Sequence, residues 1–299
     1  MADTGHFIDI QTSKGKFKVW TEKHGDNPDC KILLLHGGPG SSHDYMKLCE
    51  PYFYKAGYEF YYYDQLGSYR SDKPDDDSLW ELPRFVDEVE QVRIALGLDK
   101  SNFILMGQSW GGLLAMEYAI HHQSALKGLI ISNMMSSTPA YGEYSKVLAK
   151  RSMSEDIRQE IEQLDAAEDY ENPRFMELLI PHYYEKHVLR IPFDSWPKCV
   201  MEAFDRINHT IYIQMQGPSE FGVKGKLANW DRSQDLKNIQ TPTLVIGGEH
   251  DTMDPKHLAW MAEQMPNGVH KECKGGSHIT MGDAPESYFK AIADFLFKL

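Results

Sequence analysis

The sequence predicts an α/β fold with a mostly parallel sheet of eight strands and a mainly helical insertion before the seventh strand. Two observations carry this prediction. Short apolar runs of strand length alternate with helical segments, as in βαβ units with right-handed crossovers. A polar, proline-punctuated tract over residues 134–236 then interrupts that alternation. We therefore expect a core domain of residues 1–133 and 237–299 and a helical cap domain of residues 134–236.

Composition limits the possible functions. The chain has 299 residues, of which 41% are hydrophobic, and a formal charge of -13. That charge repels phosphate backbones and anionic lipid surfaces, so we expect neither nucleic acid nor membrane as a partner. No basic segment followed by an apolar one opens the chain, which favours a soluble cytoplasmic protein. The four cysteines are scattered and predict no disulfide framework.

The first strands lead to a glycine-rich loop. The segments 7–11 and 17–21 alternate apolar and polar residues, which predicts a hairpin at a sheet edge. The apolar run 31–35 predicts a buried strand, and it continues into His36-Gly-Gly-Pro-Gly40. This loop suits an oxyanion hole, because glycines can leave backbone N–H groups open. A phosphate-binding loop would need a lysine that the next residues lack.

The elements that follow lead to a serine. Residues 58–63 predict an aromatic strand, and residues 84–96 a helix that ends at Gly97. The apolar run 103–106 then enters Gly107-x-Ser109-x-Gly111, followed by helix-forming residues. This pattern is a nucleophile elbow, in which a sharp turn lifts the serine hydroxyl above the sheet. We interpret Ser109 as a nucleophile, and residues 126–132 as the next buried strand.

Two further candidate side chains follow the last strands. Residues 241–247 predict a buried strand, and Asp251 comes directly after it. Residues 270–273 predict the eighth strand, after which His278 lies on a glycine-rich loop, and the chain closes on an amphipathic helix over 285–299. Asp254 is the alternative acid. Successive ligand types at residues 249–251 point to opposite sides of an extended chain, so we expect no metal site.

Serine, aspartate and histidine in this chain order, each after a separate strand, are typical of α/β-hydrolases. A serine hydroxyl becomes nucleophilic when an imidazole takes its proton, and a carboxylate fixes the tautomer of that imidazole. We assign these roles to Ser109, His278 and Asp251. An oxyanion hole needs two N–H donors, and we nominate the backbones of Gly38 and Trp110.

A family resemblance sharpens the function. The chain resembles the proline iminopeptidases of the α/β-hydrolase fold nearly end to end, through His36-Gly-Gly-Pro-Gly40, Asp64-Gln-Leu-Gly67 with Ser71-Asp72 and Pro74, Gly107-Gln-Ser-Trp-Gly-Gly112, and Gln216-Gly-Pro-Ser-Glu-Phe221. The last motif is the more specific one. Two positions depart from the family pattern: Tyr69 replaces a usual glycine, and Thr252 replaces a glutamate that some members place after the catalytic aspartate.

The resemblance implies an aminopeptidase that reads a free N-terminus. Glu220 is the only acid between Gln216 and Trp230, and we expect its carboxylate to bind the substrate amine. A surface salt bridge with Lys224 or Lys226 is the alternative. We predict a cofactor-independent serine aminopeptidase that removes proline or another small or apolar residue from small peptides or amino-acid amides. An amidase or carboxylesterase of the same fold remains open, as does a non-catalytic ligand receptor.

Overall fold

The computed structural model describes residues 5–170, 172–219 and 222–299, in which eight strands form one sheet. The strand order is β1-β2-β4-β3-β5-β6-β7-β8. β1 and β2 pair antiparallel, as do β2 and β4, whereas the remaining pairs are parallel. The predicted α/β fold and its mostly parallel sheet are thus confirmed. The strands are β1 His6–Thr12, β2 Gly15–His24, β3 Lys31–Leu35, β4 Glu59–Asp64, β5 Phe103–Gln108, β6 Gly128–Ser132, β7 Thr243–Gly248 and β8 Gly268–Cys273.

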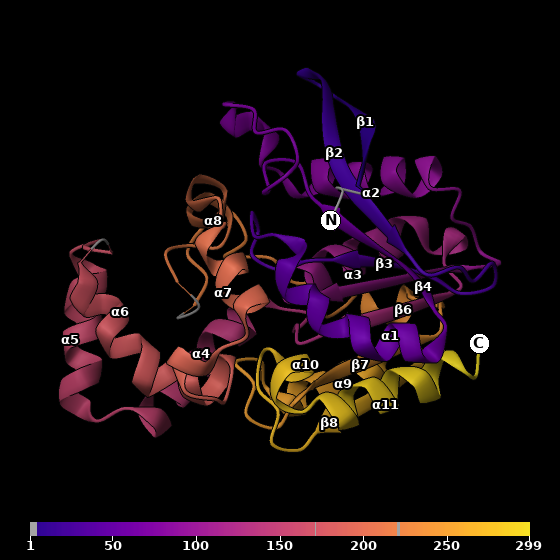
Figure 1. Cartoon of the computed structure of the whole chain (residues 1–299). Coiled ribbons are helices and arrows are strands. Elements are labelled where there is room, and N and C mark those ends of the chain that lie inside the picture. Colours follow the sequence, from indigo (N-terminus) through magenta and orange to yellow (C-terminus); the bar gives the residue numbers. More distant parts are fainter. Residues whose placement is uncertain (1–4, 171, 220–221) are drawn as a thin grey trace.

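Alternate side chains of the central strands enter two separate cores. In β3, Leu33 and Leu35 pack into one hydrophobic cluster, while Ile32 and Leu34 pack into the other. Helices α2, α3 and α9 contribute to the first cluster and α1 and α11 to the second, so both faces of the sheet are covered (Figure 1). These core helices are α1 Glu50–Ala56, α2 Leu82–Ala95, α3 Trp110–His122, α9 Pro255–Gln264, α10 Thr280–Asp283 and α11 Pro285–Leu296.

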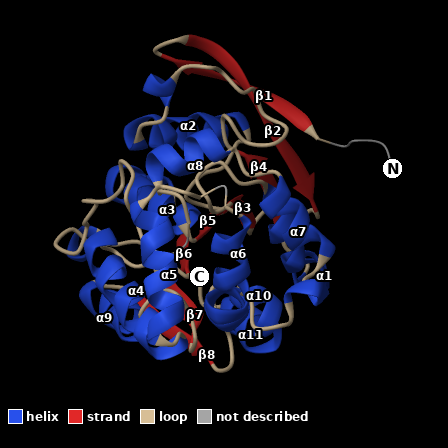
Figure 2. Cartoon of the chain, turned by 90° about the vertical axis from the view of Figure 1, so that its left-hand side faces the viewer, coloured by secondary structure: helices blue, strands red, loops and turns tan. Residues whose placement is uncertain are grey.

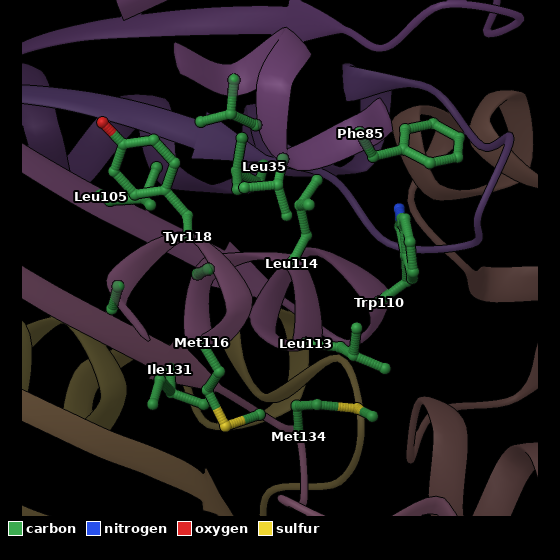
Figure 3. Close-up of a cluster of buried hydrophobic side chains, with 14 of the residues drawn as sticks. Leu35, Phe85, Leu105, Trp110, Leu113, Leu114, Met116, Tyr118, Ile131 and Met134 are labelled. Atoms are coloured by element: carbon green, nitrogen blue, oxygen red, sulfur yellow. The ribbon is translucent and has the colours of Figure 1, made fainter. Parts of the chain in front are cut away.

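Helix α3 occupies the centre of the first cluster. Its residues Leu113, Leu114 and Tyr118 are nearly or fully buried and pack with strand residues such as Leu35 (Figure 3). A helix that is apolar on most sides suits a position enclosed by sheet and neighbouring helices. This burial fixes the start of α3, and therefore the turn that precedes it.

Five α-helices and one π-helix lie between β6 and β7 in the described part of the chain. Figure 1 shows them together at the left of the sheet, and Figure 2 views the molecule from that side. Three of these described α-helices begin with side-chain caps, since Ser137 accepts from Ala140 N, Asn172 from Arg174 N and Asn208 from Ile211 N. These elements are α4 Thr138–Ser152, α5 Glu155–Ala166, α6 Pro173–Leu179, the π-helix Ile180–Val188, α7 Lys198–Asp205 and α8 His209–Met215.

No helix in the described ranges is long and apolar enough to cross a membrane.

Candidate active site

Ser109 lies at the turn between β5 and α3 with a left-handed backbone, at φ 56 and ψ -127. The glycines around it are sterically required. A Cβ on Gly107 would clash with the backbone of Gly111, and a Cβ on Gly111 would clash with the carbonyl group of Leu35. The sequence pattern therefore permits strand and helix to approach closely enough for the turn to form. The strained backbone holds the hydroxyl clear of the helix.

The structure brings Ser109, His278 and Asp251 into one hydrogen-bonded row. Ser109 Oγ lies 2.9 Å from His278 Nε2, and His278 Nδ1 lies 2.8 Å from Asp251 Oδ1. Asp251 is fully buried and His278 is 5% exposed. Asp254, the alternative acid, instead accepts a hydrogen bond from Lys256 N and caps α9. A row of this geometry can transfer a proton from the serine hydroxyl to the imidazole.

Asp251 has further partners that the sequence did not indicate. Asn133 Nδ2 lies 2.5 Å from Asp251 Oδ2, and Met253 N donates to Asp251 Oδ1 at 3.1 Å. Thr252 Oγ1 lies 3.0 Å from His278 Nδ1. Asn133 is fully buried with a left-handed backbone, φ 52. Its position directly after the buried strand β6 was the one sequence feature that indicated a site residue, but an asparagine there also suits an ordinary turn.

A second network holds the backbone next to His278. Gln108 Nε2 donates to His278 O at 2.8 Å, and Gln108 Oε1 accepts from Tyr45 OH at 2.7 Å. The Tyr45 hydroxyl in turn accepts from Gly37 N at 2.6 Å. The glycine-rich loop, the elbow strand and the histidine loop are therefore linked through two buried side chains, neither of which the sequence analysis singled out.

The inserted helices also hold the histidine loop. His278 N donates to His187 O, and Ile279 N donates to Val188 O. Ser277 Oγ donates to Val188 O at 2.9 Å. The end of the π-helix thus supports the backbone that carries the imidazole.

Gly38 and Trp110, the two nominated oxyanion donors, both line a small cavity beside Ser109. Gly38 has φ 100, a conformation that favours glycine. Trp110 is the first residue of α3, so its N–H has no acceptor within the helix. The side chain of Trp110 is fixed by a 2.8 Å hydrogen bond from Nε1 to Gln65 Oε1.

A larger pocket of about 180 Å³ also borders Ser109. Its walls come from the elbow, the histidine loop and the inserted helices. Glu220, the predicted amine-binding residue, lies outside the described residues. Its neighbours along the chain, Ser219 and Gln216, line the larger and the smaller cavity respectively.

Comparisons with known proteins identify the family and support the fold. Residues 31–285 match the alpha/beta hydrolase fold family. The chain is 48% identical over 289 residues to a proline iminopeptidase of Flavobacterium johnsoniae, and 47% identical over 291 residues to one of Elizabethkingia meningoseptica, with 97% of each chain aligned in both cases.

Two solved structures superimpose over nearly the whole chain. A proline iminopeptidase of Mycobacterium smegmatis has a TM-score of 0.86 at 28% identity, with 98% of both chains covered. VinJ has a TM-score of 0.90, also at 28% identity, with coverage of 98% of this chain and 99% of VinJ. The chain therefore belongs to the proline iminopeptidase family of α/β-hydrolase-fold enzymes.

Proposed function

We propose that this enzyme removes an N-terminal residue, proline foremost, from peptides with a free amine, through an acyl-enzyme on Ser109. The observation that carries the proposal is the row Ser109–His278–Asp251, with spacings of 2.9 and 2.8 Å, in a chain 48% identical to a proline iminopeptidase. The same row supports an amino-acid amidase or a carboxylesterase, which the named relatives do not favour.

The mechanism follows from the geometry. Ser109 Oγ attacks the scissile carbonyl carbon while His278 Nε2 takes its proton. The tetrahedral intermediate collapses, the C–N bond breaks, and His278 gives that proton to the leaving nitrogen. A water molecule then attacks the acyl-enzyme, gives a proton to His278, and releases the acid as Ser109 regains its hydrogen. Asp251 holds the imidazole in the tautomer with Nδ1–H and stabilises its charged form.

Gly38 and Trp110 would donate their backbone N–H groups to the oxygen that becomes negative in the intermediate. Both border the small cavity that also touches Ser109, which supports this role. Losing one such donor typically costs about 100- to 1000-fold in rate.

Residues 134–236 would form a cap domain that controls substrate access to Ser109. Within it, the Glu220 carboxylate would bind the substrate amine. The partners of Lys224 and Lys226 support amine binding over a surface salt bridge for Glu220. Lys224 pairs with Asp165, and Lys226 Nζ lies 2.7 Å from Glu81 Oε1. Both lysines that could neutralise Glu220 thus have other acidic partners.

A substrate panel tests the function. We expect prolyl naphthylamide to be cleaved, its N-acetylated form to be refractory, and the matched ester to be cleaved because its leaving group is better. Equal cleavage of the free and acetylated amides would contradict recognition of the amine. Cleavage of the esters alone would favour an esterase. Labelling of Ser109 by a fluorophosphonate, absent in Ser109→Ala, separates an enzyme from a ligand receptor.

A further inference from the structure

Ser109 borders two cavities of unequal volume. One has a volume of about 180 Å³ and the other about 10 Å³. Ser109 and Gly38 border both of them, so a carbonyl group attacked by Ser109 can extend its two substituents in the two directions. His278 lines only the larger pocket, and Trp110 lines only the smaller one.

The position of His278 determines which cavity holds the leaving group and which holds the acyl residue. The leaving nitrogen must accept a proton from His278 Nε2, which requires hydrogen-bonding distance of about 3 Å. The leaving group therefore lies against the imidazole, on the side of the larger pocket. The acyl residue extends the other way, along Trp110 and toward the segment that flanks Glu220.

The walls of the larger pocket are mainly apolar. Beyond the elbow and the glycine loop, the inserted helices and the histidine loop contribute Met176, Tyr184, Val188, Ala203, Phe204, Ile207 and Ile279. Among the described residues that line it there is no aspartate, glutamate, lysine or arginine. A charged group entering this pocket would lose hydration without gaining a counter-ion, whereas an apolar group would gain by burial.

We propose that the larger pocket binds the leaving group and selects an uncharged apolar or aromatic one. For a peptide, that group is the second residue. This inference rests on the proposed function, since it assumes that Ser109 is acylated. Two parts of the site then determine specificity. One part binds the free amine and the small acyl residue, and the larger pocket binds the apolar side chain of the leaving group.

The test is a series Pro-X-NH2 in which X is Gly, Ala, Leu, Phe, Lys or Asp. All members form the same acyl-enzyme and release amines of similar basicity, so differences in kcat/KM report binding of the leaving group. We expect kcat/KM to rise about 10- to 100-fold from Gly to Phe. The kcat/KM values for X = Lys and X = Asp should be equal to or lower than the value for X = Gly.

Matched variants locate the effect. Ile207 lines the larger pocket and Val223 lines the smaller one, whereas Ile213 on α8 is 49% exposed and lines neither. Ile207→Asn should reduce the advantage of Phe over Gly in kcat/KM about tenfold. Ile213→Asn should retain the wild-type gradient. Ile207→Ala replaces Ile207→Asn if the latter lowers the melting temperature markedly.

Three results would contradict the proposal. A flat series in the wild-type enzyme, or a preference for Lys or Asp, would show that the pocket does not select apolar leaving groups. A gradient that Val223→Asn removes and Ile207→Asn retains would reverse the assignment of the two cavities. Absence of turnover for every member would overturn the proposed function and this inference with it, whereas turnover without a gradient overturns only the role of the pocket.

Discussion

The side-chain amide nitrogen of Asn133 lies 2.5 Å from Asp251 Oδ2, while the other carboxylate oxygen of Asp251, Oδ1, faces His278. The same nitrogen lies 3.1 Å from Ser277 O, in the loop that carries His278, and 2.8 Å from Thr280 Oγ1, at the start of α10. One buried amide thus joins the carboxylate to the histidine loop. Its own oxygen accepts from Ser132 Oγ at 2.7 Å, which fixes the orientation of the amide.

We expect replacement of Asn133 to lower kcat about 10- to 100-fold with little change in KM, because one charge-assisted hydrogen bond to the carboxylate is lost. Asn133→Gly keeps the left-handed backbone and Asn133→Ala strains it, so the pair separates the amide from the backbone. Rates are measured on prolyl naphthylamide. Wild-type kcat in Asn133→Gly would show that only the backbone conformation matters.

Asn133→Asp provides a second test, the pH–rate profile, which would stay unchanged if Asn133 served only the structure. A carboxylate beside Asp251 disfavours ionisation of both groups. The acid limb of the pH–rate profile should therefore move to higher pH in this variant.

The contrast between Asp251 and Asn133 shows what the sequence could predict. Asp251, His278 and Ser109 can be predicted from the sequence because each is a reactive residue type that follows a predicted strand, and parallel strands place such residues at one edge. Asn133 also follows a strand, but its role depends on Asp251, 118 residues further along the chain. An asparagine in a left-handed turn is common without any such role. Gln108 was missed because a buried strand residue usually serves packing.

Asp251→Asn should lower kcat about 10³- to 10⁴-fold, because an amide cannot hold the imidazole in the reactive tautomer. Asp254→Asn is the matched control, since Asp254 caps α9 and its loss should affect stability by about 1 kcal/mol instead. Steady-state turnover of prolyl naphthylamide measures the effect on kcat, and thermal unfolding measures the effect on stability. A larger loss of kcat in Asp254→Asn would reverse the assignment.

Arg206 connects the end of α7 to the core through Asp44, at 2.5 Å between Nη1 and Oδ2, and lies over the ring of Tyr69 at 4.1 Å. Burial of Asp44 opposes its ionisation, but hydrogen bonds from Arg206, Lys47 and Ser42 outweigh burial and hold its pKa well below the usual range. Tyr69, a departure from the family pattern, thus contributes to a contact between inserted helices and core.

We expect Arg206→Gln to lower the free energy of unfolding by about 1–3 kcal/mol and to raise KM, because Asp44 is fully buried and loses a charged partner. Arg174→Gln removes a comparable ion pair, 2.7 Å from Glu160, in which both side chains are exposed. That control should lose under about 1 kcal/mol. Equal losses in urea unfolding would show that the buried pair has no special role.

Glu220→Gln should lower kcat/KM for prolyl naphthylamide about 10- to 1000-fold, because the substrate ammonium loses its carboxylate partner. Hydrolysis of nitrophenyl acetate, which has no amine, should stay nearly unchanged. An equal loss on both substrates would show that Glu220 supports the fold and does not read the amine.

We expect the free energy of unfolding to fall in mildly acidic solution because of two buried histidines, His36 and His187. Burial is the largest effect on both His36 and His187, and it lowers the pKa of each ring below the ordinary value of 6.5. His36 Nδ1 lies 2.8 Å from Gly37 O, and His187 Nδ1 lies 2.8 Å from His250 O. These hydrogen bonds favour the charged rings, but burial outweighs them, so both rings stay neutral to a lower pH in the folded protein than in the unfolded chain.

The sign follows from proton uptake. Below pH 6.5 the unfolded chain binds protons at these two sites and the folded chain does not, so the free energy of unfolding declines as pH falls from 6.5 toward the folded pKa values. Each site contributes at most about 1.4 kcal/mol per pH unit. Urea unfolding between pH 8 and pH 5 measures this slope. His187→Gln should reduce it, whereas His121→Gln, at a ring that is 56% exposed, should leave it unchanged. An unchanged slope in His187→Gln would show that this histidine titrates alike in both states, and the decline would then have to come from other groups.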